Sequence, residues 1–293
     1  MKQQILKYTM EMYIQAVIIM FPIMNRGVCY WINETRYELL GNNAEADKIT
    51  VHERDVYIAG NRFTNQGYPI ACYWKNGERT DLTDGSYDAI AYGIGIRESV
   101  IIVTGLFMTN YHQERACYWI NGTRRSLTTS GDAGATDIFI SGDKAYISGY
   151  HLPNTNDFVG KAVYWRVVGQ NKTQINLSKA ANSGAEVWAI YVDGSDIYAA
   201  GYQNTVNVGN RATYWKNRNR VELDDGTDLY EITEVHDIGV KDGQVFAVGY
   251  ISKTDDPYYW GVANLSACYW LDGKRYVLSG DSEFAEARAI FIP

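Results

Sequence analysis

The stretch ACYWKNGERTDL, residues 71–82, decides the fold because copies of it recur along the whole chain. The other copies span 28–39, 116–127, 162–177, 212–223 and 267–278. Their tryptophans lie 43 to 55 residues apart: Trp31, Trp74, Trp119, Trp165, Trp215 and Trp270. Recurrence at such a period indicates a repeat architecture.

A second element follows each of the first five copies in full, made of two apolar segments around a short polar turn, the second segment ending in glycine. The instances are ITVHERDVYIAG (49–60), IGIRESVIIVTG (94–105), IFISGDKAYISG (138–149), IYVDGSDIYAAG (190–201) and IGVKDGQVFAVG (238–249). Strong β-formers around such a turn predict a hairpin. The Tyr-Trp element predicts a second hairpin, with Asn76-Gly77 and Asn121-Gly122 as its turn residues.

Each repeat of about 46 residues therefore contains four short strands, which we call a to d. Six such repeats predict an all-β fold, a six-bladed β-propeller of four-stranded blades that forms a single domain over residues 1–293. A β-solenoid has shorter repeats with fewer strands, and a sandwich does not repeat so regularly. The propeller is the interpretation that fits.

The two ends of the chain predict how the ring closes. The last copy ends at AEARAIFIP (285–293), which matches strand a alone, while EMYIQA (11–16) resembles the strand b segment DVYIAG (55–60). We therefore expect the N-terminal strand to pair with the C-terminal strand and complete the sixth blade, with residues 1–10 as a flexible extension. The alternative for residues 1–24 is a signal peptide, although no Ala-x-Ala-like cleavage site follows the apolar run.

The bulk composition excludes some function classes. A hydrophobic fraction of 46% and an aromatic fraction of 14% indicate a folded globular protein. The net charge of −7 argues against a general nucleic-acid binder, which needs a basic surface. The apolar run near the N-terminus is also shorter than the roughly 20 residues of a membrane-spanning helix.

Comparison among the copies separates scaffold from candidate site. The position of Cys72 is filled elsewhere by Cys29, Cys117, Cys268, Val163 and Thr213, which indicates a small buried site rather than a disulfide or a metal ligand. Both rings of each Tyr-Trp pair are expected to be core. An arginine five residues after the tryptophan recurs as Arg36, Arg79, Arg124, Arg220 and Arg275. We expect a repeated structural ion pair there, and a ring of basic charge is the alternative.

A position just before strand a carries glutamate in four copies, as Glu45, Glu186, Glu234 and Glu286. Two residues further on the copies diverge completely, to Asp47, Tyr92, Thr136, Trp188, His236 and Arg288. Scaffold positions should agree between blades, so the divergent position is a candidate ligand site around the channel mouth. A carboxylate ring with one histidine could bind a divalent cation such as Ca²⁺. The alternative is that each glutamate satisfies backbone N–H groups of its own turn.

The long b–c connection at 252–266 carries Tyr258, Tyr259 and Trp260. Aromatic side chains on a loop often anchor sugars or protein partners, so these three join the candidate ligand-binding residues. The alternative is that the loop folds back and buries them. FMTNYHQER (107–115) is another b–c connection that differs from its counterparts.

The sequence favours a non-catalytic binding module over an enzyme. It contains four histidines without metal-ligand spacing, and it has no Gly-x-Ser-x-Gly elbow, P-loop or Cys-x-x-Cys pair. The leading hypothesis is a monomeric propeller that binds a protein or glycan through the d–a and b–c loop face, without a cofactor. The competing hypothesis is a metal-dependent propeller hydrolase or lactonase that uses the Glu/His236 ring, and a purely structural domain is a third.

The motifs Tyr-Trp-x-Asn-Gly (73–77) and Asp-x-Tyr-x-Ala-Gly (55–60) resemble the repeats of six-bladed β-propeller repeat proteins of bacteria, many from the Bacteroidetes. They are similar, more distantly, to HAF-type extracellular repeats and to the YWTD propellers of LDL-receptor-like proteins. Here Lys-Asn or Ile-Asn replaces Thr-Asp, so only the architecture carries over. The resemblance implies a secreted or cell-envelope protein, and it implies no particular activity.

Overall fold

The structure is a computed structural model. It describes residues 14–15, 28–32, 35–39, 43–153, 160–178, 184–205, 209–223, 231–253, 265–279 and 285–290. The regular elements in the described part of the chain are β-strands. No helix in that part is long and apolar enough to cross a membrane. The chain divides into two compact units, Met1–Thr129 and Ser130–Pro293, which are described separately.

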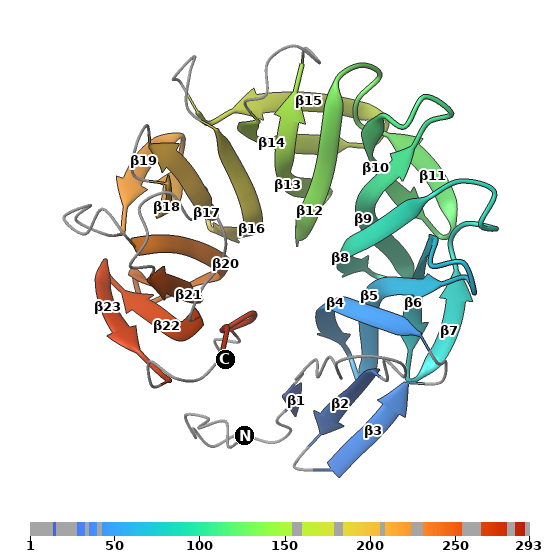
Figure 1. Cartoon of the computed structure of the whole chain (residues 1–293), viewed down its shortest axis with the longest axis horizontal. Coiled ribbons are helices and arrows are strands. Elements are labelled where there is room, and N and C mark those ends of the chain that lie inside the picture. The colour runs from blue at the N-terminus through green and yellow to red at the C-terminus, as the bar shows by residue number, and fades with distance from the viewer. Residues whose placement is uncertain are drawn as a thin grey trace. The chain divides into compact units, whose positions relative to one another are not determined.

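The N-terminal unit contains three antiparallel sheets (Figure 1). The first has three strands, β1 (Ile14–Gln15), β2 (Val28–Ile32) and β3 (Thr35–Leu39). The second has four, β4 (Ala44–His52), β5 (Asp55–Phe63), β6 (Pro69–Lys75) and β7 (Glu78–Asp81). The third also has four, β8 (Ala89–Arg97), β9 (Val100–Met108), β10 (Glu114–Ile120) and β11 (Thr123–Ser126).

The C-terminal unit contains three four-stranded antiparallel sheets, each in simple chain order (Figure 1). The first is β12 (Asp132–Ser141), β13 (Lys144–Leu152), β14 (Lys161–Val168) and β15 (Asn171–Asn176). The second is β16 (Ala185–Asp193), β17 (Asp196–Thr205), β18 (Gly209–Lys216) and β19 (Asn219–Glu222). The third is β20 (Glu231–Lys241), β21 (Gln244–Lys253), β22 (Leu265–Leu271) and β23 (Lys274–Val277).

The fold is a β-propeller with four-stranded blades, and the predicted blade count of six is wrong, because the described residues form five such blades. The first sequence copy forms only a three-stranded sheet, in which β1 pairs with β2. The last copy, residues 285–290, belongs to no sheet. The predicted closure by pairing of the N-terminal and C-terminal strands is therefore also wrong for the described residues.

The C-terminal segment bonds to the preceding blade. The backbone N–H groups of Ala285 and Ala287 donate to the carbonyls of Leu265 and Gly249, each at 3.1 Å. The N–H of Ile290 donates to the Asp237 carboxylate at 2.9 Å. Strand β16 makes equivalent bonds to its preceding blade, from Ala185 N–H to the Gly160 carbonyl and from Ile190 N–H to the Asp137 carboxylate. Residues 285–290 therefore pack as a strand a does, but in the five blades strand a pairs with a strand b joined to it by a tight turn, and these residues have no such partner in the described part of the chain.

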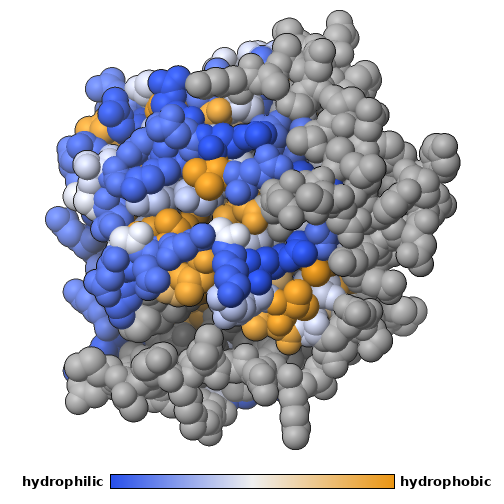
Figure 2. Space-filling model, turned by 90° about the vertical axis from the view of Figure 1, so that its left-hand side faces the viewer, coloured by the Kyte–Doolittle hydropathy of each residue, from blue (hydrophilic) through white to orange (hydrophobic). Residues whose placement is uncertain are grey.

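The repeated tryptophan is core, as predicted. In the five blades its side chain is at most 1% exposed, at Trp74, Trp119, Trp165, Trp215 and Trp270. The four cysteines are free thiols and are all buried. By contrast, the face in Figure 2 is mainly hydrophilic, with hydrophobic residues visible only in small patches among the placed side chains.

The c–d hairpin turns have the conformation that the Asn-Gly signal predicts. Asn76 and Gly77 have φ of 51° and 87°, and Asn121 and Gly122 have φ of 45° and 81°. Two successive residues with positive φ are typical of a type I′ turn, whose twist matches that of a hairpin. The asparagine also accepts a hydrogen bond from the second residue of strand b, as in Ile101 N–H to Asn121 Oδ1 at 3.0 Å.

The inner hairpin of every blade carries a β-bulge, where strands a and b slip by one residue. The residue skipped by the pairing is Asp47, Tyr92, Thr136, Trp188 or His236. Opposite each bulge lies the glycine that ends strand b in the sequence repeat: Gly60, Gly105, Gly149, Gly201 and Gly249. A Cβ atom on any of these glycines would overlap a backbone carbonyl oxygen of the bulge, so the glycine is required for space.

The asparagine turn yields a first prediction. Asn121→Ala removes an acceptor and places a residue with a poor left-handed propensity at positive φ, so we expect a loss of about 1–2 kcal/mol in unfolding free energy. Asn121→Asp should stay within about 0.5 kcal/mol of the wild type, because Asp272 fills the same position in the last blade and accepts from Val245 N–H at 2.9 Å. Chemical denaturation measures both, and equal losses for the two variants would contradict the role of the acceptor.

The buried cysteines yield a second prediction. Burial raises the pKa of the Cys72 thiol to about 12, and burial also raises the pKa of Cys117. Thiolates are the reactive species, so we expect Ellman's reagent to modify none of the four cysteines in the native protein and all four in denaturant. Rapid modification of Cys72 in the folded protein would show that this position is not core.

Candidate functional site

The divergent position of the sequence repeat coincides with the β-bulge in all five blades. A bulge leaves one residue outside the strand pairing and redirects its side chain, and bulges are common beside active sites. Arg288 holds the corresponding place in the C-terminal segment. The bulge residues therefore occupy equivalent positions in their blades, but their side chains make different contacts.

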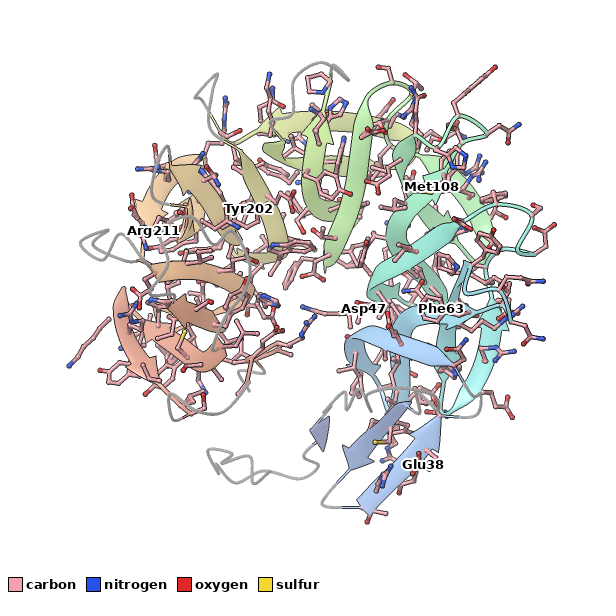
Figure 3. The ribbon with its side chains drawn as sticks, in the orientation of Figure 1. Glu38, Asp47, Phe63, Met108, Tyr202 and Arg211 are labelled. Atoms are coloured by element: carbon pink, nitrogen blue, oxygen red, sulfur yellow. The ribbon has the colours of Figure 1, made fainter. Side chains whose placement is uncertain are left out.

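In the N-terminal unit the bulge residues take part in contacts within the scaffold. Asp47, labelled in Figure 3, accepts a hydrogen bond from the Asn61 amide at 3.2 Å. Asn61 in turn accepts from the Ala91 N–H at 2.8 Å and so links two blades. Glu45 pairs with Asn61 across β4 and β5, and Tyr92 is the bulge residue of β8.

Thr136 has a similar structural role in the C-terminal unit. Its hydroxyl lies 3.0 Å from the Ser148 hydroxyl and donates to the Val187 carbonyl of the next blade at 2.5 Å. Both contacts are buried. This bulge residue therefore joins blades rather than facing a ligand.

Trp188 and His236 behave differently, because these two bulge residues stack on each other. Their ring centroids lie 6.4 Å apart with the planes 21° from parallel. The ring of Tyr250, on β21, meets His236 edge-on at 5.4 Å. Three aromatic side chains from three strands thus lie beside one another, and we call Trp188, His236 and Tyr250 the aromatic cluster.

A buried carboxyl group lies beneath this cluster. Asn210 donates to Oε1 of Glu234 at 2.7 Å, and the Tyr250 hydroxyl donates to the same carboxyl group. Burial raises the pKa of Glu234 even though both of these hydrogen bonds act to lower it. A second pair of the same kind occurs in the neighbouring blade, where the Tyr202 hydroxyl (Figure 3) donates to Glu186.

His236 is held as a neutral imidazole. Burial, assisted by the charge of Arg288, lowers its pKa to about 3. Its Nε2 atom lies 4.0 Å from Oε2 of Glu234, beyond hydrogen-bonding distance. Nε2 of His236 and Nε1 of Trp188 are both buried, and neither has a hydrogen-bond partner in the described part of the chain.

The C-terminal segment places two charged side chains, Arg288 and Glu286, near the cluster. Arg288 forms an ion pair with Glu286 at 2.6 Å, and the two side chains are 48% and 22% exposed. The Glu286 carboxylate acts to raise the pKa of Glu234, and Arg288 acts to lower it. The two charges of the pair compensate each other, so Arg288 and Glu286 together add little net charge to the cluster.

Three of the four glutamates that the sequence suggested as metal ligands lie in the C-terminal unit, and each of these three has a hydrogen-bond or ion-pair partner. Glu186 accepts from Tyr202, Glu234 from Tyr250 and Glu286 from Arg288. Glu45 belongs to the N-terminal unit. Over the described ranges, no group of three or more His, Cys, Asp or Glu side chains is arranged to hold a metal ion. A Ca²⁺ site stays a prediction.

The three aromatic residues of the long b–c connection are not placed. Tyr258, Tyr259 and Trp260 lie outside the described residues, so their role as anchors stays a prediction. Sequence reasoning missed Asn210, Tyr202 and Tyr250. A signal existed for the tyrosines, because each directly follows the glycine that ends strand b.

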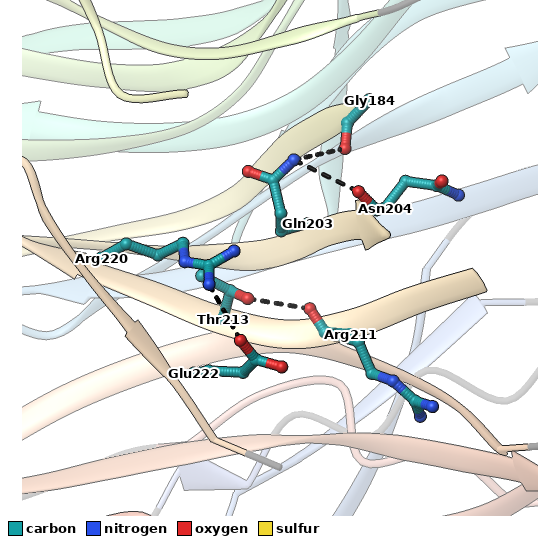
Figure 4. A network of polar contacts seen from close by, with 7 residues as sticks. All are labelled: Gly184, Gln203, Asn204, Arg211, Thr213, Arg220 and Glu222. Atoms are coloured by element: carbon teal, nitrogen blue, oxygen red, sulfur yellow. Dashed lines mark hydrogen bonds and ion pairs between the residues drawn. The ribbon is translucent and has the colours of Figure 1, made fainter. Parts of the chain in front are cut away.

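The repeated arginines form ion pairs, as predicted, in most copies. Arg220 contacts Glu222 at 3.0 Å, two positions along the same strand (Figure 4). Equivalent pairs join Arg36 to Glu38 at 2.7 Å and Arg79 to Asp81 at 3.0 Å. Exposed pairs of this kind contribute little to stability.

No protein-family model matches the chain, and no curated protein is similar to it in sequence. Similar solved structures include a thermostable family-43 glycoside hydrolase, with 12% identity, a TM-score of 0.47 and coverage of 83% of this chain and 95% of that one. The β-propeller domain of the Trilobed protease from Pyrococcus furiosus has 12% identity, a TM-score of 0.47 and 88% coverage of both chains.

A mutant of AofleA from Arthrobotrys oligospora is also similar, with 10% identity, a TM-score of 0.48 and coverage of 91% of this chain and 83% of that one. These low identities and TM-scores assign no activity to the present chain. Its bacterial origin and its membership of a particular repeat family stay predictions.

The neutral histidine predicts how stability depends on pH. The ordinary pKa of 6.5 falls to about 3 in the folded state. As the pH falls below 6.5 the unfolded chain takes up a proton that the folded state does not, so the contribution of His236 to stability is lost between about 6.5 and about 3. Glu234, whose pKa is raised by burial, acts in the opposite direction.

His236→Phe removes this titration while keeping an aromatic ring. We expect the unfolding free energy of the wild type to fall more steeply than that of the variant as the pH is lowered from 7 to 4, measured by denaturation at each pH. The same difference between the two proteins at every pH would contradict a neutral buried imidazole.

Proposed function

We propose that this β-propeller is a non-catalytic binding protein whose aromatic cluster holds a neutral polar ligand, a sugar unit of a glycan. One observation carries the proposal. The bulge residues of two neighbouring blades, Trp188 and His236, stack on each other with ring nitrogens that have no hydrogen-bond partner in the described part of the chain. Buried polar groups are normally paired, so these atoms are suited to ligand hydroxyl groups. The indole nitrogens of the core residues Trp74, Trp119 and Trp215 also have no partner among the described residues, so Nε2 of His236 is the atom that distinguishes this cluster.

The electrostatics of the cluster support a neutral ligand. His236 is uncharged at neutral pH because its pKa is about 3. Arg288 and Glu286 compensate each other in an ion pair. A sugar ring has an apolar face that can stack on an aromatic side chain and hydroxyl groups that can bond to ring nitrogens, so it matches the cluster.

Two further groups of residues are proposed to contact the ligand. Arg288 is half exposed, and its guanidinium can donate to ligand oxygens at the rim of the cluster. Tyr258, Tyr259 and Trp260 follow β21, the strand that carries Tyr250, in the sequence. The proposal includes these three as further anchors for a longer glycan.

A metal-dependent hydrolase is the competing function. Its one supporting observation is the buried Glu234 carboxyl group with a raised pKa, which is a property of general acids. That function requires a bound cation, and the carboxylates of Glu186 and Glu234 would have to exchange their tyrosine partners for it.

The test is a screen of the full chain against an array of neutral and acidic glycans, followed by calorimetry of neutral hits. We expect Trp188→Ala and His236→Ala to weaken binding of a neutral glycan at least about 10-fold, a loss of about 1.4 kcal/mol. Tyr191→Ala is the matched control, because Tyr191 lies on the same strand but packs on Phe139. It should bind as the wild type does.

Several results would contradict the proposal. One is neutral-glycan binding that neither Trp188→Ala nor His236→Ala changes, and another is the absence of any neutral glycan that binds. Stoichiometric Ca²⁺ in the purified protein, lost in the double variant Glu186→Ala and Glu234→Ala, would favour the hydrolase instead.

A further inference from the structure

One of the repeated arginines lacks the carboxylate that the others have. In three copies an acidic residue follows the arginine by two positions and pairs with it on the same strand, and Arg275 pairs instead with Glu231 at 2.8 Å. After Arg124 that position is filled by Ser126. No carboxylate of the described residues lies within ion-pair distance of Arg124.

The Arg124 guanidinium rests instead on aromatic rings. It lies 3.8 Å from the ring centroid of Phe107 and 5.0 Å from that of Tyr87. The two rings meet edge to face at 6.1 Å. Such stacking positions a guanidinium without neutralising it, so its donors stay able to bind an anion.

This arginine lines a groove of about 470 Å³ in the blade β8–β11. The groove lies beside the connection that begins after Met108, the residue labelled in Figure 3 at the end of β9. Asn110, Tyr111 and Gln113 from that connection also line it. Tyr111 is 85% exposed, an unusual position for an aromatic ring.

The connection is an ordered turn. The Thr109 hydroxyl accepts from the N–H groups of Tyr111 and Gln113, each at 3.3 Å. The backbone of Thr109 bonds to those of Gln113 and His112 at 2.9 Å. Arg115 donates to Oε1 of Gln113 at 2.5 Å and fixes that side chain. A turn held this way loses little conformational entropy when a ligand binds.

We infer that this groove binds an acidic sugar, a hexuronate unit of a glycan. Its carboxylate would accept charge-assisted hydrogen bonds from Arg124. Its ring would stack on Tyr111, and its hydroxyl groups would bond to the amides of Asn110 and Gln113. The groove is lined by two arginines, of which Arg115 is buried and bonds to Gln113, so Arg124 is the cation placed to meet a ligand. Its position beside an exposed aromatic ring and two amides matches this mixed chemistry better than it matches a bare anion. The site lies in the N-terminal unit and is independent of the aromatic cluster.

The probe is trigalacturonic acid, with neutral galactotriose as its comparison, titrated calorimetrically into the full chain at low ionic strength. We expect the acidic trisaccharide to bind at least about 10-fold more tightly than the neutral one. Arg124→Met should abolish this preference. Arg79→Met is the matched control, because Arg79 occupies the same repeat position but is paired with Asp81, and it should leave binding unchanged.

A second variant keeps the arginine and supplies the missing partner. Ser126→Glu recreates the arrangement of Arg220 and Glu222, so it should weaken trigalacturonate binding at least about 10-fold, whereas Ser126→Gln should not. Thermal melts show that each variant is folded. Equal binding of both sugars, no binding of trigalacturonate, or no effect of Arg124→Met and Ser126→Glu would overturn the inference. Equally tight binding of a polyglutamate peptide would show that the groove recognises carboxylates in general.

Discussion

The close approach of a backbone carbonyl to a glycine in each inner hairpin is the constraint on which the rest of the structure depends. The bulge in strand a pushes a carbonyl oxygen against strand b, where any Cβ atom would overlap it. The carbonyl oxygen leaves no space for a Cβ atom, and no unusual φ is involved. Only glycine fits, so the second hairpin of the sequence repeat always ends in glycine.

The same constraint separates scaffold from function. Since the bulge residue lies outside the strand pairing, its identity is free to vary while the glycine and the tryptophan are kept. At this variable position Thr136 donates a hydrogen bond to the next blade, whereas Trp188 and His236 stack on each other. One backbone device thus serves structural contacts in some blades and a candidate ligand site in others.

Repetition determined what could be predicted from the sequence. The four strands per blade, the Asn-Gly turns and the buried tryptophans follow from local patterns that recur, and the structure confirms them. The blade count does not follow, because residues 285–290 look like strand a but pair with no strand in the described part of the chain. The stacking of Trp188 on His236 depends on how neighbouring blades pack, and no single repeat contains that information.

The most direct test of this account is the unfolding free energy of Gly201→Ala, at the glycine opposite the Trp188 bulge. Its Cβ would overlap the Glu186 carbonyl oxygen, which is backbone and cannot move aside cheaply. We expect a loss of about 3 kcal/mol, the upper part of the usual range for overpacking. A loss of less than about 0.5 kcal/mol, as for an ordinary surface substitution, would contradict it.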